Sequence, residues 1–426
     1  MNSDFKGSIS IPANGSLLTK FFKFLGPGLL VSVGYMDPGN WATDIEAGSR
    51  FGYLLLFVVL FSSLGAIALQ YLSLKLGIAG GLDLARASRL HCSSRSNIFQ
   101  WFLAEIAIIA TDIAEVLGSA LAFKLLFGCS LLVGVAITCL DTFLVLAFVG
   151  KGFRKIEAII LGLVMTISIC YLAELFFVKP DFSAVLNGYI PAKTLIENTH
   201  SWYLAIGIIG ATIMPHNLYL HSAIVQTRNF GVSEKEKRQA IRFSSTDTIV
   251  SLGLAFLVNS AILILSASAF HSHGHHDVAD IQDAHRLLEP LLGTSLAPFL
   301  FAIALLASGQ SSTFTGTIAG QVILEGYLNL QLPSWKVRLI TRGLSLVPAF
   351  LGVALLGDDS TGRLLVITQV VLGLQLPFAV FPLIRFTSNK SLMGSFTNGP
   401  SLKLLAWGFF ALISLANLWL IFKIFF

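Results

Sequence analysis

The chain has 426 residues, of which 55% are hydrophobic and only 12% are charged, and its formal net charge is +5. Soluble proteins carry about twice that charged fraction, so the composition excludes an ordinary soluble domain. Apolar stretches of about 18 residues or more recur along the chain, which is the length a helix needs to cross a bilayer. We therefore predict an all-α polytopic membrane protein.

The apolar stretches predict 11 transmembrane helices. The predicted spans are 24–47, 51–76, 98–127, 130–149, 155–178, 201–228, 241–270, 291–327, 335–356, 362–388 and 401–424. If successive connections alternate between the two faces, most of the 28 lysines and arginines fall on the face that carries the N-terminus. The positive-inside rule then predicts a cytoplasmic N-terminus and, with an odd number of spans, an extracellular or periplasmic C-terminus.

Two of the predicted spans are interrupted by polar residues and a proline. The first contains DPGN at 37–40 and the sixth contains MPHN at 214–217. Proline removes a backbone donor, so each span is expected to break there. The two spans lie five apart and run in opposite directions, as in an inverted repeat. We predict one membrane domain with a cytoplasmic tail (1–23), a first repeat (24–178), a second repeat (201–388) and an additional helix (401–424).

The two breaks bring together side chains that suit a soft divalent cation. Asp37 offers a carboxylate oxygen, Asn40 an amide oxygen, and unwound backbone near Ala211 a carbonyl oxygen. Met214 adds a thioether sulfur, which favours Mn²⁺, Fe²⁺, Co²⁺ or Cd²⁺ over Mg²⁺ and Ca²⁺. A lone methionine in a membrane helix more often only packs, but Met214 precedes the proline of the second break.

These stretches resemble the Nramp family of proton-coupled divalent metal transporters. The similarity continues through TDIAEVLGSA (111–120), ALLASGQSS (304–312) and ITQVVLGLQLPFA (367–379), and it covers nearly the whole chain. It implies a leucine-transporter-like fold and uptake of Mn²⁺ and Fe²⁺ coupled to protons. It also implies that Asp37, Asn40, the Ala211 carbonyl and Met214 bind the metal, with Gln369 joining when the site occludes.

Proton transfer requires ionisable residues of its own. Asp112 and Glu115 share a helical face, and Glu105 lies on the same stripe. Carboxylates at such depth usually face a cavity, a partner charge or a proton path. They could instead form structural ion pairs with Arg338 and Arg342. We expect Asp37 to exchange a proton for metal, Asp112 and Glu115 to relay it, and the two arginines to tune the relay.

Histidines follow the second break and crowd one outer connection. His216 and His221 are expected to influence pH dependence and helix packing, with direct metal ligation the less favoured role. Residues 271–285 contain five histidines and three aspartates without fixed ligand spacing. This segment could concentrate metal, although such loops are more often only solvated. The buried amides Gln70, Asn259 and Asn417 are expected to join neighbouring helices or to line the pathway, with the structural role favoured.

The leading hypothesis is a bacterial manganese or iron importer of the inner membrane, not an enzyme. No GxxxxGK[ST] phosphate loop occurs, so ATP is not expected to drive transport. A Na⁺-coupled amino-acid symporter of the same fold and a non-transporting metal-sensing receptor remain alternatives. We expect no cofactor, no nucleic acid and no obligate protein partner, so the partners are the metal ion, protons and the lipid bilayer. The four cysteines are expected to be buried free thiols.

Overall fold

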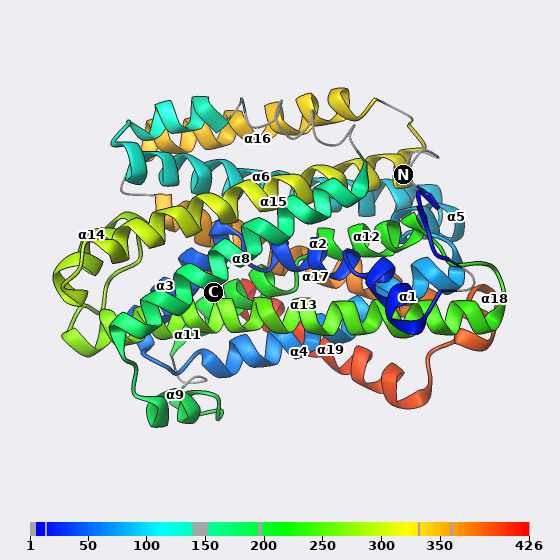
Figure 1. The fold of residues 1–426 in the computed structure, drawn as a ribbon, viewed down its shortest axis with the longest axis horizontal. Coiled ribbons are helices and arrows are strands. Elements are labelled where there is room, and N and C mark those ends of the chain that lie inside the picture. Colours follow the sequence, from blue (N-terminus) through cyan, green and yellow to red (C-terminus); the bar gives the residue numbers. More distant parts are fainter. Residues whose placement is uncertain are drawn as a thin grey trace.

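The computed structural model describes residues 6–12, 15–138, 140, 152–194, 198–330, 333–357 and 361–425. Within these ranges, the side chains of residues 334, 335, 337, 338, 341, 342, 356, 424 and 425 are not described. The described chain is a bundle of long helices that lie side by side (Figure 1). A continuous apolar cluster extends through it, from α2 to α19.

The first half of the chain contains β1 (Ile9–Ser10), α1 (Leu17–Phe24), α2 (Pro27–Gly34), α3 (Pro38–Phe51), α4 (Leu56–Lys75), η1 (Leu76–Gly80), α5 (Leu84–His91), α6 (Ser94–Phe127), α8 (Phe153–Val178) and α9 (Phe182–Gly188). The second half contains α11 (Thr199–Thr212), α12 (Pro215–Ile224), η2 (Val225–Thr227), β2 (Arg228–Asn229), α13 (Glu234–Ala269), η3 (His271–His273), α14 (Ile281–Leu292), α15 (Leu296–Leu328), α16 (Ser334–Leu356), α17 (Thr361–Thr387), α18 (Lys390–Met393), η5 (Gly394–Phe396) and α19 (Pro400–Phe425).

Nine segments of the described chain are long and apolar enough to span a membrane. They correspond to nine of the predicted spans, while α16 holds a shorter apolar stretch, Gly343–Leu355, at the predicted ninth span. Most of the predicted fourth span, 130–149, lies outside the described residues. The all-α polytopic class is confirmed.

Local signals set where these helices begin and end. Ser233 and Glu236 form a capping box at the start of α13, and Ser93 caps α6. Gly128 ends α6 in the left-handed conformation, at φ 69°, which glycine adopts without a steric penalty. The start of α13 and both ends of α6 are therefore set by ordinary capping chemistry.

The N-terminal residues are more ordered than a plain tail. β1 pairs in parallel with β2, where Ile9 aligns with Arg228. α1 begins at Leu17, before the predicted start of the first span at residue 24, and Phe24 is buried. In Figure 1, α1, α5 and α18 lie at one end of the bundle, whereas α9 and α14 lie at the other.

The two interrupted helices pack crosswise. α11 contacts α3, while α12 contacts α2, so each half of one broken helix lies against a half of the other. Gly34 at the end of α2 directly faces the amide of Asn217 in α12, because a Cβ at residue 34 would overlap that side chain. The two breaks are therefore neighbours inside the bundle, as the predicted inverted repeat requires.

Candidate metal-binding site

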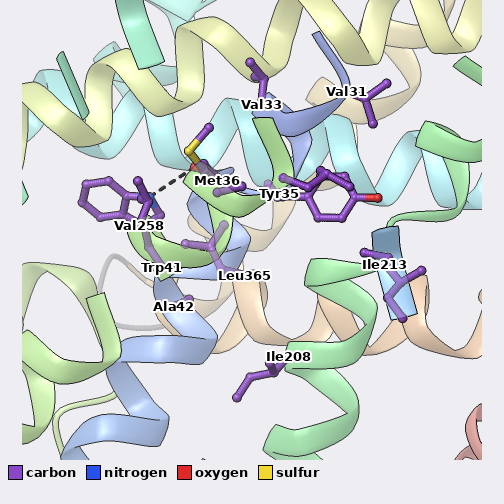
Figure 2. Close-up of a cluster of buried hydrophobic side chains, with 14 of the residues drawn as sticks. Val31, Val33, Tyr35, Met36, Trp41, Ala42, Ile208, Ile213, Val258 and Leu365 are labelled. Atoms are coloured by element: carbon purple, nitrogen blue, oxygen red, sulfur yellow. Dashed lines mark hydrogen bonds between the residues drawn. The ribbon is translucent and has the colours of Figure 1, made fainter. Parts of the chain in front are cut away.

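The first break is a helix start placed inside an apolar bundle. Asp37 is the N-cap of α3, and its Oδ1 accepts a hydrogen bond from the Asn40 backbone N–H at 2.9 Å. Pro38 follows at the first helical position, where its missing N–H costs nothing. Sequence alone therefore explains why α2 does not continue into α3. Figure 2 shows the apolar side chains around this break, including Tyr35 and Met36.

Two other helices and α3 itself satisfy the carbonyls that the first break frees. Asn259 of α13 donates to the Tyr35 carbonyl at 2.8 Å, and Ser308 of α15 donates to the Met36 carbonyl at 2.6 Å. The Trp41 indole also donates to the Met36 carbonyl, at 3.3 Å, which is the dashed line in Figure 2. Buried backbone groups are costly unless they are paired, so these contacts hold the unwound segment in one conformation.

The second break is also a helix start with a proline at its first position. Met214 is the N-cap of α12 and Pro215 is its first residue. Residue 215 is also the position whose N–H would bond to the Ala211 carbonyl in a continuous helix, and proline has none. The carbonyl of Ala211 is thus left without its intrahelical donor. The Met214 side chain is fully buried and packs with Ala107, among others, in α6 and α17.

Gln369 of α17 lies between the two breaks. A Cβ on Gly39 would overlap the Gln369 side chain, and a Cβ on Gly210 would overlap the Gln369 backbone carbonyl. Gln369 therefore contacts α3 two residues after Asp37 and α11 one residue before Ala211. These contacts bring Gln369 next to the stretches of α3 and α11 that carry the predicted ligands Asp37, Asn40 and Ala211.

The polar atoms of this region are left without ordinary partners. Asp37, Asn40 and Gln369 are each at most 1% exposed. Within the described chain, Asp37 Oδ2, Asn40 Oδ1 and Gln369 Oε1 have no hydrogen-bond partner. Buried polar atoms normally have one, so three such oxygens together favour a bound cation. No cluster of three or more His, Cys, Asp or Glu side chains suited to a metal occurs among the described residues.

Comparison with known proteins identifies the family. The family described as "Natural resistance-associated macrophage protein-like" (Nramp) matches residues 28–423. The "Divalent metal cation transporter MntH" of Ralstonia nicotianae is 60% identical over 99% of this chain and 96% of its own length. A protein of Pseudomonas aeruginosa named "Divalent metal cation transporter MntH 1" is 58% identical over 97% of this chain and 94% of its own.

The chain belongs to the Nramp family. Among solved structures, a mutant of the Eremococcus coleocola manganese transporter superposes with a TM-score of 0.91 at 39% identity, covering 98% of this chain and 90% of that one. Mhp1, a nucleobase-cation-symport-1 family transporter, shares the fold alone, with a TM-score of 0.63 at 14% identity over 99% of this chain and 93% of Mhp1. This Nramp protein is therefore a multi-pass divalent metal cation transporter with the predicted leucine-transporter-like fold, and not an enzyme.

The carboxylates predicted to carry protons lie on α6 of this Nramp protein. Asp112 and Glu115 are 5% and 1% exposed, respectively. Gly316 of α15 leaves space for Glu115, because a Cβ there would lie 2.6 Å from its Oε1. α16 packs along α6, but the side chains of Arg338 and Arg342 lie outside the described residues. Their predicted pairing with the α6 carboxylates stays a prediction.

The two histidines after the second break join the helices around it. The Nδ1 of His216 lies 3.2 Å from the Thr111 hydroxyl of α6. His221 contacts Gln70 Oε1 through Nδ1, at 2.9 Å, and the Thr248 hydroxyl through Nε2, at 3.5 Å. Gln70 in turn donates to the Tyr35 hydroxyl at 2.8 Å. Both ring nitrogens of His221 therefore contact other side chains, and its expected influence on pH dependence stays a prediction.

A further polar group was not predicted from the sequence. Asp44 of α3 and Glu174 of α8 are 2% and 0% exposed. Tyr171 lies on α8, one helical turn before Glu174. Within the described chain, Asp44 Oδ2, both carboxylate oxygens of Glu174 and the Tyr171 hydroxyl have no hydrogen-bond partner. The Tyr171 ring packs edge-on against Trp41 at 4.9 Å between centroids, directly after the DPGN break. The sequence signal for this group was an acidic residue inside each of two predicted apolar spans.

The histidine-rich segment contacts the outer end of α3. Ser49 donates to the His275 carbonyl at 2.7 Å and accepts from the Val278 N–H at 3.0 Å. His271 bonds the Ser49 carbonyl at 2.8 Å through Nδ1. The segment is therefore attached to the helix that begins at Asp37, and the capture role considered from its composition stays a prediction.

Proposed function

We propose that this protein imports Mn²⁺ and Fe²⁺, and also accepts Cd²⁺ and Co²⁺, together with protons by alternating access. The observation that carries the proposal is the set of three buried, unpaired oxygens at Asp37, Asn40 and Gln369, where the two helix breaks meet. The Eremococcus coleocola relative is described as a manganese transporter. Transporters with broken helices bind their substrates at such a point.

Ion selectivity is assigned to Met214. The other donors are oxygens, which alone would suit Mg²⁺ or Ca²⁺ as well. A thioether adds affinity for softer first-row ions and contributes nothing for hard ones. Met214 is fully buried at the start of α12, three residues after Ala211, so its sulfur and the freed carbonyl belong to the same break.

Proton coupling is assigned to Asp37 and the α6 carboxylates. Metal binding requires the ionised form of Asp37, so arrival of the cation releases any proton held there. Asp112 and Glu115 are buried acids on the helix that packs against α3, since a Cβ on Gly118 of α6 would overlap the Pro38 side chain. They provide the next positions for that proton on its way to the cytoplasm, which the positive-inside rule places on the side of the N-terminus.

A proteoliposome flux assay tests the substrate assignment. Uptake of Mn²⁺, Fe²⁺, Mg²⁺ and Ca²⁺ is measured at two external pH values for the wild type, Met214→Ala and Met393→Ala. Met393 is also buried, at 2% exposure, but lies in α18, so it is a matched control. We expect Met214→Ala alone to admit Ca²⁺ or Mg²⁺. Unchanged exclusion of both ions in Met214→Ala would contradict the role of the sulfur.

The proton assignment is tested in the same vesicles with Asp37→Asn and Glu115→Gln. We expect Asp37→Asn to abolish metal-driven proton entry along with metal uptake. Glu115→Gln should keep part of the metal uptake and lose its pH dependence, because an amide cannot relay a proton. Metal uptake by Asp37→Asn at the wild-type rate and with wild-type pH dependence would exclude the proposed exchange at Asp37.

A further inference from the structure

A buried lysine at the end of α4 has no anionic partner among the residues that the structure describes. Lys75 is 4% exposed, its ammonium donates to the amide oxygen of Asn398, and it lies 5.6 Å from the centre of the Tyr71 ring. Within the described chain, no carboxylate is within ion-pair distance of Lys75. Buried charges are normally paired, because desolvating a lone ion is costly. A neutral amide and an aromatic ring leave most of that cost uncompensated.

Lys75 lines a cavity with two other cations. The cavity has a volume of about 430 Å³ and lies between α4, α13 and the segment that leads into α19. Arg238 and Arg242 of α13 also line it, and the Arg238 guanidinium lies 5.1 Å from the centre of the Phe396 ring. None of its lining residues is acidic.

Some of this charge is already partnered. Arg238 pairs with Glu234, at 2.5 Å, on the exposed side of α13. Arg242 forms no ion pair with a carboxylate in the described part of the chain. The hydroxyls of Thr397 and Ser245 donate to backbone carbonyls, and Ser395 forms a hydrogen bond with Glu234. The cations are therefore the main groups left to recognise a ligand. The cavity therefore carries a net positive charge.

An apolar groove continues from this basic cavity. The groove has a volume of about 470 Å³ and shares Tyr71, Ser245 and Leu402 with the cavity. It runs along the membrane-spanning parts of α4, α13 and α19, where Leu64, Ile249 and Leu405 are 55%, 53% and 49% exposed. A basic end joined to an apolar channel, at the end of spanning helices, is complementary to a lipid with an anionic headgroup.

We propose that this composite site binds an anionic phospholipid. Its phosphate occupies the basic cavity beside Lys75, Arg238 and Arg242, and an acyl chain lies in the groove between α4 and α19. The cavity is at the end of the bundle that carries α1 and α18 (Figure 1), which the positive-inside rule places at the anionic cytoplasmic leaflet. A lipid bound there contacts three helices at once and stabilises their packing.

The proposal is tested by lipid binding to the purified full-length protein. Thermal unfolding and native mass spectrometry are followed while delipidated protein is titrated with phosphatidylglycerol, phosphatidylcholine or glycerol 3-phosphate. We expect phosphatidylglycerol to raise the unfolding temperature and to remain bound, and the other two to do neither. Equal effects of phosphatidylcholine would overturn the role of the cations, and equal effects of glycerol 3-phosphate would overturn the role of the groove.

Variants locate the binding. Arg238→Gln with Arg242→Gln alters exposed side chains, so the fold should persist, and phosphatidylglycerol affinity should fall roughly tenfold or more. Arg286→Gln removes a comparably exposed arginine, 69% by side chain, in α14 at the other end of the bundle and should bind as the wild type does. Wild-type affinity in the double variant, or an equal loss in Arg286→Gln, would overturn the assignment to this site. Adding Lys75→Met to the double variant should lower its affinity for phosphatidylglycerol further.

Discussion

The contact between α11 and α17 makes Gly210→Ala a stringent test of the site. An added Cβ at residue 210 would lie 2.5 Å from the Gly373 backbone nitrogen and would overlap the Gln369 carbonyl. Non-bonded heavy atoms rest at about 3.5 Å, so the two helices must separate by roughly 1 Å. The atoms that the added Cβ would meet belong to the backbone and cannot change rotamer. Ala211 and Gln369, which lie on the two helices, must therefore move apart.

The energetic cost can be bounded. Overpacking of this kind costs about 1–3 kcal/mol, while replacing a helical glycine with alanine returns about 1 kcal/mol. We therefore expect a net loss of about 0–2 kcal/mol in unfolding free energy. The larger effect should be on the metal, because a shift of roughly 1 Å takes two ligands out of coordination range; we expect the KM for Mn²⁺ to rise roughly tenfold.

The assay is the initial rate of Mn²⁺ uptake in proteoliposomes, with thermal unfolding measured in detergent. Gly253→Ala is the control, because outside the adjoining backbone of α13 no atom of the described residues lies within 4 Å of the added Cβ. It should keep the wild-type KM and unfold no earlier. A wild-type KM in Gly210→Ala, despite a lower unfolding temperature, would show that α11 and α17 do not hold metal ligands.

Three further predictions concern other contacts within the bundle. Ser49→Ala removes two hydrogen bonds to the histidine-rich segment, worth about 2 kcal/mol together, and should speed amide exchange at 275–278; unchanged exchange would refute the attachment. Gln70→Leu leaves the Tyr35 hydroxyl and a His221 nitrogen without their hydrogen-bond partner, which should lower the free energy of unfolding by about 1–3 kcal/mol for each group. An unaltered unfolding temperature would contradict this network. Burial lowers the pKa of His285 below 6.5, so the folded state binds fewer protons than the unfolded state and loses stability as the pH falls below 6.5. His285→Gln should therefore unfold at a temperature less sensitive to pH between 8 and 5, and identical pH profiles would count against buried neutral His285.

The sequence was sufficient for features that depend on local chemistry. Proline removes a donor wherever it stands, so the breaks at Asp37 and Met214 followed from 37–40 and 214–217 before any packing was known. The buried amides Gln70, Asn259 and Asn417 do join neighbouring helices; Asn417 donates to the Gly373 carbonyl at 2.8 Å. Membrane helices leave few other roles for a buried amide.

Features that depend on which helices meet could not be predicted. The unpaired oxygens of Asp44 and Glu174 belong to α3 and α8, and nothing in either stretch indicates the other. The place of Gln369 between Gly39 and Gly210 likewise depends on the crossing of α17 with both broken helices, and only the family resemblance pointed to it. The start of α1 was missed because Leu17–Phe24 contains two lysines within its apolar pattern.

The predicted ligand set holds one formal negative charge, that of Asp37, beside two amides, a carbonyl and a thioether. A dication bound there would keep an excess positive charge in surroundings of low polarity, where such an excess is costly. Its dwell time would then be short compared with that in a cage of several carboxylates. A transporter needs such a short-lived bound state, because an ion that is bound too tightly is not released on the other side of the membrane.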